Sequence, residues 1–195
     1  MINIDEQAGN FKNHVATLND YGNIKVLDFK NPDSSNYQIR FIFEEDYCRL
    51  HISGDLGYLF AFNPDNMTYK GFSDFVDNID YFKEKIVSHD RPIYKYDYDK
   101  ALKDLKNLFY EYEVEDSIIE YPDEDHDEQL ESAAKECLED FNHHTGIGHV
   151  GYEKLQELIY DPAEEAEYIG RVETGILELY MLAFKLAKKQ IDERK

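Results

Sequence analysis

The sequence contains no tryptophan, only two cysteines, and half as many basic as acidic residues. Cys48 and Cys137 stand far apart and in no Cys-x-x-Cys or Cys/His pattern, which predicts free thiols in a reducing compartment. No apolar run approaches the roughly 20 residues of a membrane span, and the first residues lack the basic and apolar regions of a signal peptide. We therefore expect a cytoplasmic protein that does not bind membranes.

Negative charge is what the chain has in excess. Its 42 Asp and Glu residues against 21 Lys and Arg residues give a formal net charge of −21. Such a field repels nucleic-acid phosphates, so we expect no direct binding of nucleic acid. The same field attracts basic proteins and speeds their encounter at low salt. Solubility, or adaptation to a salty cell, is the alternative explanation, and acidity alone does not decide between them.

The chain is long and apolar enough to form a real core. Its 195 residues need neither disulfides nor a structural metal to fold. Aromatic residues make up 14% of the sequence, as 16 Tyr and 12 Phe, which excludes a disordered chain despite the charge.

The N-terminal part predicts one helix and then four strands. Phe11, Val15 and Leu18 recur at helical spacing, which indicates an amphipathic helix from about Ile4 to Asp20. Short turns connect the following runs, so the strands form an antiparallel meander. These extended or alternating apolar runs occupy residues 24–29, 37–43, 47–52 and 58–62.

From Phe72 onward the apolar periodicity is helical. Short helices are expected near residues 72–76, 81–86 and 152–159, and longer ones near 97–112, 130–141 and 164–192. The predicted fold class is α+β: an N-terminal helix and a four-stranded antiparallel meander packed with helices, followed by a C-terminal helical bundle. Two domains, 1–112 and 113–195, or a single domain over 1–195, fit this pattern.

An acidic tract separates the two halves, with no Lys or Arg between Asn107 and Ala134. If the tract were helical at 1.5 Å per residue, it would carry a charge roughly every 2.7 Å, comparable to the one per about 1.7 Å of duplex DNA. An exposed loop is the simpler interpretation, and a surface for a basic partner is the sharper one. The candidate partner-binding residues are Glu111, Glu113, Glu115, Asp116, Glu120, Asp123, Glu124, Asp125, Asp127 and Glu128.

The string Gly146-Ile147-Gly148-His149-Val150-Gly151 matches the G-x-G-x-x-G pattern of dinucleotide sites. Such a site needs a strand before the glycines and a parallel sheet around them, and neither is expected here. We interpret the string as a helix C-cap and a loop. Likewise, the glycines of Ser53–Gly57 are explained by a hairpin turn, and the residues of Tyr94–Tyr98 by packing on the core.

Histidines in the same loop allow a second hypothesis. His143, His144 and His149 lie near Glu139 and Asp140, and imidazole and carboxylate are ligands for zinc or iron. Neither an H-E-x-x-H motif nor a Glu-x-x-His pair is present, so solvated loop histidines are the alternative. We expect no catalytic residue and no cofactor, with this metal site left as an open question.

Several different short motifs follow one another along most of the chain. They are Leu50–Gly57, Phe75–Asn78, Tyr81–Ile86, Tyr96-Asp97 with Ala101 and Leu105, and Tyr180–Ala187. In these motifs the chain resembles a family of small acidic proteins encoded by tailed phages and prophages. That family has no established chemistry, so the resemblance implies a setting and no catalytic residue. The setting is the cytoplasm of a bacterial host.

The resemblance also implies a class of function. Many acidic phage proteins disarm host defence, and several anti-CRISPR proteins present acidic faces to the nucleic-acid channel of Cas9. We therefore expect a phage-encoded inhibitor of a nucleic-acid-dependent defence enzyme, with a Cas9-type effector as its basic partner and a DNA-mimicking surface. Two alternatives stay open: a nucleotide- or metal-dependent phage enzyme, and a regulatory or assembly protein that forms a homodimer through its final apolar helix.

Overall fold

The computed structural model describes residues 4–112, 114 and 126–194, and its fold is α+β. The chain forms two compact units: unit 1 comprises Met1–Ile93 and Thr174–Lys195, and unit 2 comprises Tyr94–Glu173. Unit 2 is thus an insertion, because the chain leaves unit 1 after Ile93 and returns at Thr174. The sequence-based division at residue 112 differs from this one.

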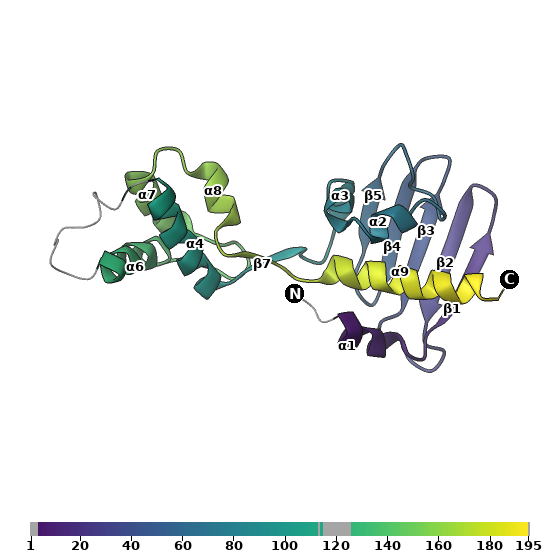
Figure 1. The fold of residues 1–195 in the computed structure, drawn as a ribbon. Coiled ribbons are helices and arrows are strands. Elements are labelled where there is room, and N and C mark those ends of the chain that lie inside the picture. The colour runs from purple at the N-terminus through teal and green to yellow at the C-terminus, as the bar shows by residue number, and fades with distance from the viewer. Residues whose placement is uncertain (1–3, 113, 115–125, 195) are drawn as a thin grey trace. The chain divides into compact units, whose positions relative to one another are not determined.

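A six-stranded antiparallel sheet forms the framework of unit 1, and each strand pairs with its neighbour in the sequence (Figure 1). Side chains alternate between its two faces. In the third strand, for example, Ile39, Phe41 and Phe43 are buried while Arg40 is exposed. The strands are β1 (Val15–Asp20), β2 (Ile24–Lys30), β3 (Ile39–Glu44), β4 (Arg49–Gly54), β5 (Leu59–Phe62) and β6 (Ile86–His89).

Helices cover one face of this sheet. The last helix, α9 (Ile176–Asp192), buries residues at helical spacing, among them Tyr180 and Phe184. The Phe184 ring lies 4.8 Å from that of Phe72 and 5.5 Å from that of Phe41, so helix and sheet share one aromatic core. The apolar side of the last helix is therefore used inside its own unit. The shorter helices are α1 (Ile4–Ala8), η1 (Gly9–Phe11), α2 (Ser73–Val76) and α3 (Ile79–Lys83).

The first strand replaces most of the helix that the sequence predicted. The helical segment ends at Phe11, and β1 begins at Val15. Tyr21 N donates to Ile24 O at 2.9 Å, and Gly22 has φ 79°, so a tight turn joins β1 to β2. The prediction of a helix to Asp20 was wrong. In β1 Ala16 is buried and Val15 is exposed, so the side chains alternate instead of following the helical spacing, and pairing with β2 makes this segment a strand.

The sheet has six strands where the sequence predicted four. Besides β1, the strand β6 pairs with β5 through Leu59↔His89 and Phe60↔Ser88. Its short run after a helical turn carries no alternation long enough to indicate a strand. The four predicted runs correspond to β2, β3, β4 and β5, so the predicted antiparallel meander is confirmed as the centre of the sheet.

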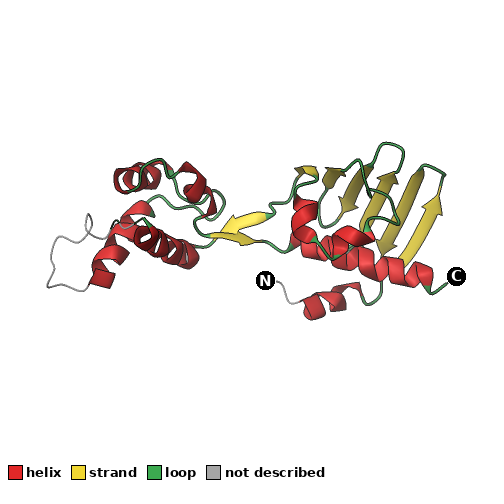
Figure 2. Ribbon diagram, turned by 45° about the horizontal axis from the view of Figure 1, so that its top comes forward, coloured by secondary structure: helices red, strands yellow, loops and turns green. Residues whose placement is uncertain are grey.

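The described residues of unit 2 form helices and one two-stranded sheet, drawn in yellow in Figure 2. The predicted helix 164–192 is in fact two helices separated by a strand. Gly170 (φ 75°) and Gly175 (φ 81°) interrupt it, because these backbone conformations end a right-handed helix. The elements of unit 2 are β7 (Tyr94–Tyr96), α4 (Tyr98–Glu111), α6 (His126–Cys137), α7 (His149–Leu158), α8 (Ala163–Tyr168) and β8 (Arg171–Glu173).

Neither cysteine forms a disulfide: Cys48 is half-buried in unit 1, and Cys137 is buried in unit 2. Burial raises the pKa of the Cys137 thiol to about 11, so this thiol is protonated at neutral pH. Among residues 4–112, 114 and 126–194, no helix has the length and apolarity needed to cross a membrane.

Candidate partner-binding surface

The negative charge of the chain is concentrated in unit 2. Of the 42 acidic residues, 24 lie between Tyr94 and Glu173, against seven of the 21 basic residues. Unit 2 therefore carries −17 of the net −21, and unit 1 carries −4. The negative electrostatic field that the composition of the chain indicates therefore arises mainly from the inserted unit.

Helix packing turns the charged side chains of unit 2 outward. Asp97 caps α4, since its Oδ1 accepts a hydrogen bond from Lys100 N at 2.8 Å. Behind this cap, one stripe of α4 is buried against α6, so the polar residues of both helices face solvent. The buried residues are Ala101, Leu105, Leu108 and Phe109 of α4, and Leu130, Ala134 and Cys137 of α6.

The cations of unit 2 are largely occupied by its own carboxylates. Five of the seven basic residues form ion pairs within the unit. Lys106 Nζ lies 2.6 Å from an oxygen of Asp127, and this hydrogen bond raises the pKa of Lys106. Lys154 Nζ lies 2.9 Å from Glu139, which raises its pKa in the same way. Because unit 2 has 24 acidic residues and seven basic ones, these pairs leave a surplus of negative charge.

Three of the ten predicted partner-binding residues are described by the structure. Glu111 is the last residue of α4, whereas Asp127 and Glu128 share the first turn of α6, and all three are exposed. Acidic side chains in a first turn also suit the positive end of the helix dipole. The prediction for the others lies outside the described residues: Glu113, Glu115, Asp116, Glu120, Asp123, Glu124 and Asp125.

The sequence reasoning missed acidic residues elsewhere in the unit. Glu136, Glu139, Glu157, Glu164 and Glu167 are also exposed. They are scattered along α6, the turn that follows it, α7 and α8, so no single run marks them. A charge count over residues 94–173 would have found them, because that segment has more than three acidic residues for each basic one.

The acidic surface of unit 2 contains a hollow between α4 and α8. It is an open hollow of about 440 Å³, lined by the carboxylates of Asp104, Glu164 and Glu165 and by the side chain of Lys100. Asp104 is bound to Lys100, and the Tyr112 hydroxyl donates to Glu165. That hydrogen bond lowers the pKa of Glu165, so the carboxylate stays charged to lower pH. With Lys100 counted, the charged side chains that line the hollow have a net charge of −2.

The glycine string belongs to the start of α7, not to a helix C-cap as predicted. Gly148 is the N-cap residue, and Asp140 accepts hydrogen bonds from Val150 N at 2.9 Å and Gly151 N at 3.0 Å. These bonds, chiefly the one from Gly151, lower the pKa of Asp140. A carboxylate of the chain thus occupies the helix end where a nucleotide site would hold phosphate.

The three loop histidines have separate surroundings. His143 Nδ1 lies 3.0 Å from Tyr96 O, and His149 Nε2 lies 3.4 Å from a carboxylate oxygen of Glu153. His144 is exposed. Within the part of the chain that the structure describes, no three His, Cys, Asp or Glu side chains are grouped so that they could hold a metal ion.

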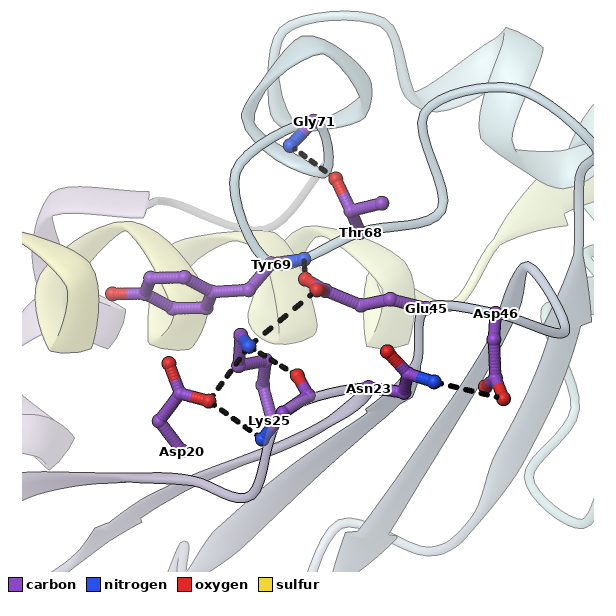
Figure 3. A network of polar contacts seen from close by, with 9 residues as sticks. Asp20, Asn23, Lys25, Glu45, Asp46, Thr68, Tyr69 and Gly71 are labelled. Carbon is purple, nitrogen blue, oxygen red and sulfur yellow. Dashed lines mark hydrogen bonds and ion pairs between the residues drawn. The ribbon is translucent and has the colours of Figure 1, made fainter.

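Unit 1 also contains a network of charged and polar groups (Figure 3). Lys25 Nζ lies 2.7 Å from Asp20 and 3.6 Å from Glu45, and Glu45 accepts a hydrogen bond from Tyr69 N at 3.0 Å. The Lys25 contact lowers the pKa of Asp20. Because its members come from the β1–β2 turn, the β3–β4 turn and the loop at Tyr69, the network fastens these loops together. We assign it a structural role.

Comparison with known protein families, with curated proteins and with solved structures finds no match to this chain.

Proposed function

We propose that this chain is a binding protein whose unit 2 engages a basic, polynucleotide-handling protein and presents carboxylates in place of phosphates. The observation that carries the proposal is the partition of charge, −17 in unit 2 against −4 in unit 1. Because ion pairs occupy most cations of unit 2, its surplus carboxylates act outward. A basic cleft that evolved for phosphates attracts such a surface.

The hollow between α4 and α8 is the proposed anchor point. A guanidinium or ammonium group entering it meets Glu164 and Glu165 beside the exposed ring of Tyr168. Carboxylate and aromatic groups together are favourable surroundings for a cation, since an ion pair and a cation–π contact form at once. A buried arginine of this kind is a frequent hot spot of protein interfaces.

The resemblance to small acidic phage proteins suggests the class of partner. On that basis we propose a phage-encoded inhibitor of a host defence enzyme that acts on nucleic acid, acting in the host cytoplasm. A Cas9-type effector is the first target to examine, because its arginines read the PAM and its basic channel holds the heteroduplex. An acidic unit seated in that channel would exclude DNA.

The test is inhibition of target cleavage by purified Cas9 effectors, together with binding measured at two salt concentrations. We expect inhibition at low salt that weakens as salt rises, because exposed charges are screened. The variant E128Q/E157Q/E164Q removes three exposed carboxylates of unit 2. We expect it to bind roughly fivefold more weakly or worse, since each exposed ionic contact contributes up to about 1 kcal/mol.

The matched control removes three exposed carboxylates from unit 1, in the variant E6Q/D33N/D65N. It makes the same change in net charge, so it separates a local surface from a general charge effect. Equal weakening by both variants would contradict a binding surface in unit 2. Unchanged cleavage across several Cas9 effectors would exclude Cas9 as the target, and binding that ignores salt would exclude the charge-based mechanism.

A further inference from the structure

The six-stranded sheet of unit 1 has one face that no described helix of this unit covers. In Figures 1 and 2, helices α9, α2 and α3 all lie on the same side of the sheet. That side holds the buried residues of the core, such as Leu27, Phe41 and Ile52. The side chains between them in each strand point to the other face.

An apolar row crosses the middle of this open face. The strand register places Val26 opposite Ile42, Ile42 opposite His51, and His51 opposite Phe60. The His51 ring stacks on Phe60 with 4.8 Å between centroids, and its Nε2 lies 3.7 Å from a carboxylate oxygen of Glu44. All four side chains are half-buried by their neighbours alone. Three of the four residues in the row are apolar, as is common at the centre of a protein interface.

Two further apolar side chains lie in the neighbouring row of the same face. Ile24 and Phe62 are 42% and 45% exposed. They stand at either end of the neighbouring row, in which Glu44 and Arg49 face each other across β3 and β4. Large apolar side chains gathered in this way on one face mark an interaction site more often than isolated ones do.

The charges of the open face nearly cancel. Arg40 binds Asp28 through two nitrogens at 2.6 and 3.1 Å, and Arg49 Nη1 lies 3.7 Å from Glu44. With Lys30 added, the face has two carboxylates and three basic groups, in a chain of net charge −21. A strongly basic partner would therefore gain little binding energy from the open face. A second surface of the same kind, apolar in the middle with ion pairs at its sides, is complementary to the open face.

The area of the face is sufficient for self-association. Six strands about 4.8 Å apart, each four to seven residues long at about 3.3 Å per residue, span roughly 25 by 18 Å. Two such faces in contact remove roughly 1,000 Å² or more from water once side-chain relief is counted. Specific interfaces begin at about this size.

We propose that the open face of this sheet, centred on Val26, Ile42, His51 and Phe60, packs against the same face of a second copy of the chain. The two sheets then lie about 10 Å apart with strands inclined by about 30°, as in aligned β-sandwiches. The interface is isologous, because both copies use the same surface. The ion pairs Asp28–Arg40 and Glu44–Arg49 of one copy therefore face the equivalent pairs of the other across a two-fold axis. This interface leaves the acidic surface of unit 2 to a different partner.

The test is the mass of the full chain in solution as a function of concentration, measured by sedimentation equilibrium. We expect a dimer whose dissociation constant rises at least about tenfold in I42K and in F60K, because an unpaired ammonium group would be buried in the apolar row. Y160K is the matched control, since Tyr160 is 97% exposed in unit 2. Thermal unfolding of each variant verifies that it is folded.

Salt distinguishes this proposal from the proposed function. Raising the salt concentration should strengthen the dimer, because it screens the repulsion between two chains of net charge −21. Binding of a basic partner by unit 2 should weaken under the same change. Either interaction can therefore fail while the other is observed.

Hydroxyl-radical footprinting of Ile24 and Phe62 provides a measurement on the unmodified chain. Protection that grows with protein concentration supports the dimer. Three results would overturn it: a monomer with both residues reactive at every concentration, a monomer with both protected, which would mean that the chain covers its own face, and a dimer that I42K and F60K leave intact.

Discussion

Gly151 lies inside α7, where a side chain would overlap the carbonyl oxygen of Cys137 on the neighbouring helix. This close approach explains the last glycine of the G-x-G-x-x-G string without a nucleotide. The first, Gly146, has φ 80° in the turn before α7, and the second, Gly148, leaves room for the Asp140 carboxylate. Each glycine therefore has a packing or backbone reason of its own.

We expect Gly151→Ala to lower the stability of unit 2 by about 2–4 kcal/mol, because the added methyl group forces α6 and α7 apart. In an open helix the same change would stabilise by up to about 1 kcal/mol. The matched control is Gly9→Ala, since a side chain at Gly9 meets nothing within 4 Å. Urea unfolding followed by circular dichroism measures both, and equal midpoints for the two variants would contradict the packing explanation.

The β1 strand shows how side chains protect an element that lies at the edge of a sheet. Ala16 N donates to Gln190 Oε1 at 3.0 Å, Gln190 Nε2 donates to His14 O at 2.9 Å, and Arg194 donates to Ala16 O at 2.8 Å. The end of α9 thus satisfies backbone groups that another strand could otherwise bind. An edge protected in this way resists pairing with a second chain.

We expect the double variant Q190A/R194A to lose about 1–3 kcal/mol of stability, since each hydrogen bond contributes about 0.5–1.5 kcal/mol. It should also scatter more light at high concentration, because the β1 edge becomes available for strand pairing. The control is K189A/E193A, which removes an exposed pair at 3.9 Å on the same helix turns. Equal unfolding midpoints and equal scattering for the two double variants would refute the protective role.

The same elements show which parts of the fold were readable from the sequence. The run of β4 alternates strictly and that of β3 does so except at Ile42, and a short turn joins them, so local pattern alone predicted both strands. The run of β1 has helical apolar spacing, and only its pairing with β2 makes it a strand. The insertion was invisible because α9 follows unit 2 in the sequence but packs in unit 1, a contact between residues as distant as Tyr180 and Leu56.

The candidate surface could be predicted from the sequence only in part, because folding brings together residues that are distant in the chain. An unbroken acidic run drew attention to residues 111–128, most of which lie outside the described residues. The carboxylates of the hollow, such as Glu164 and Glu165, come from a helix some 40 residues further along the chain. Folding brings them next to Asp104 of α4, and no spacing rule connects such positions.

At the scale of the whole molecule, the two units divide the tasks that we propose. Unit 2 carries the charge for a basic partner, whereas unit 1 carries a nearly neutral sheet face for a second copy. A dimer built on unit 1 would present two acidic units, which raises the effective concentration of the second after the first has bound. This division of tasks is simplest if unit 1 can fold without the inserted unit 2.

The join between the units leads us to expect that unit 1 folds alone. Thr174 N donates to Ile93 O at 2.9 Å, and Thr174 Oγ1 donates to Pro92 O at 2.7 Å, so the two ends of the insertion are held together within unit 1. A chain in which a short Gly-Ser linker replaces residues 94–173 closes a loop of low entropic cost. We expect it to fold cooperatively, with the β-rich circular dichroism spectrum of a six-stranded sheet.

This shortened chain separates the two proposals in one experiment. Its net charge is −4, so we expect it to lose measurable binding to any basic partner of the full chain, by at least about a hundredfold at low salt. Its dimer should be tighter than that of the full chain, because two units of charge −17 no longer repel each other. Retained partner binding would place the binding surface in unit 1, and a monomeric shortened chain would show that the open sheet face alone does not suffice for association.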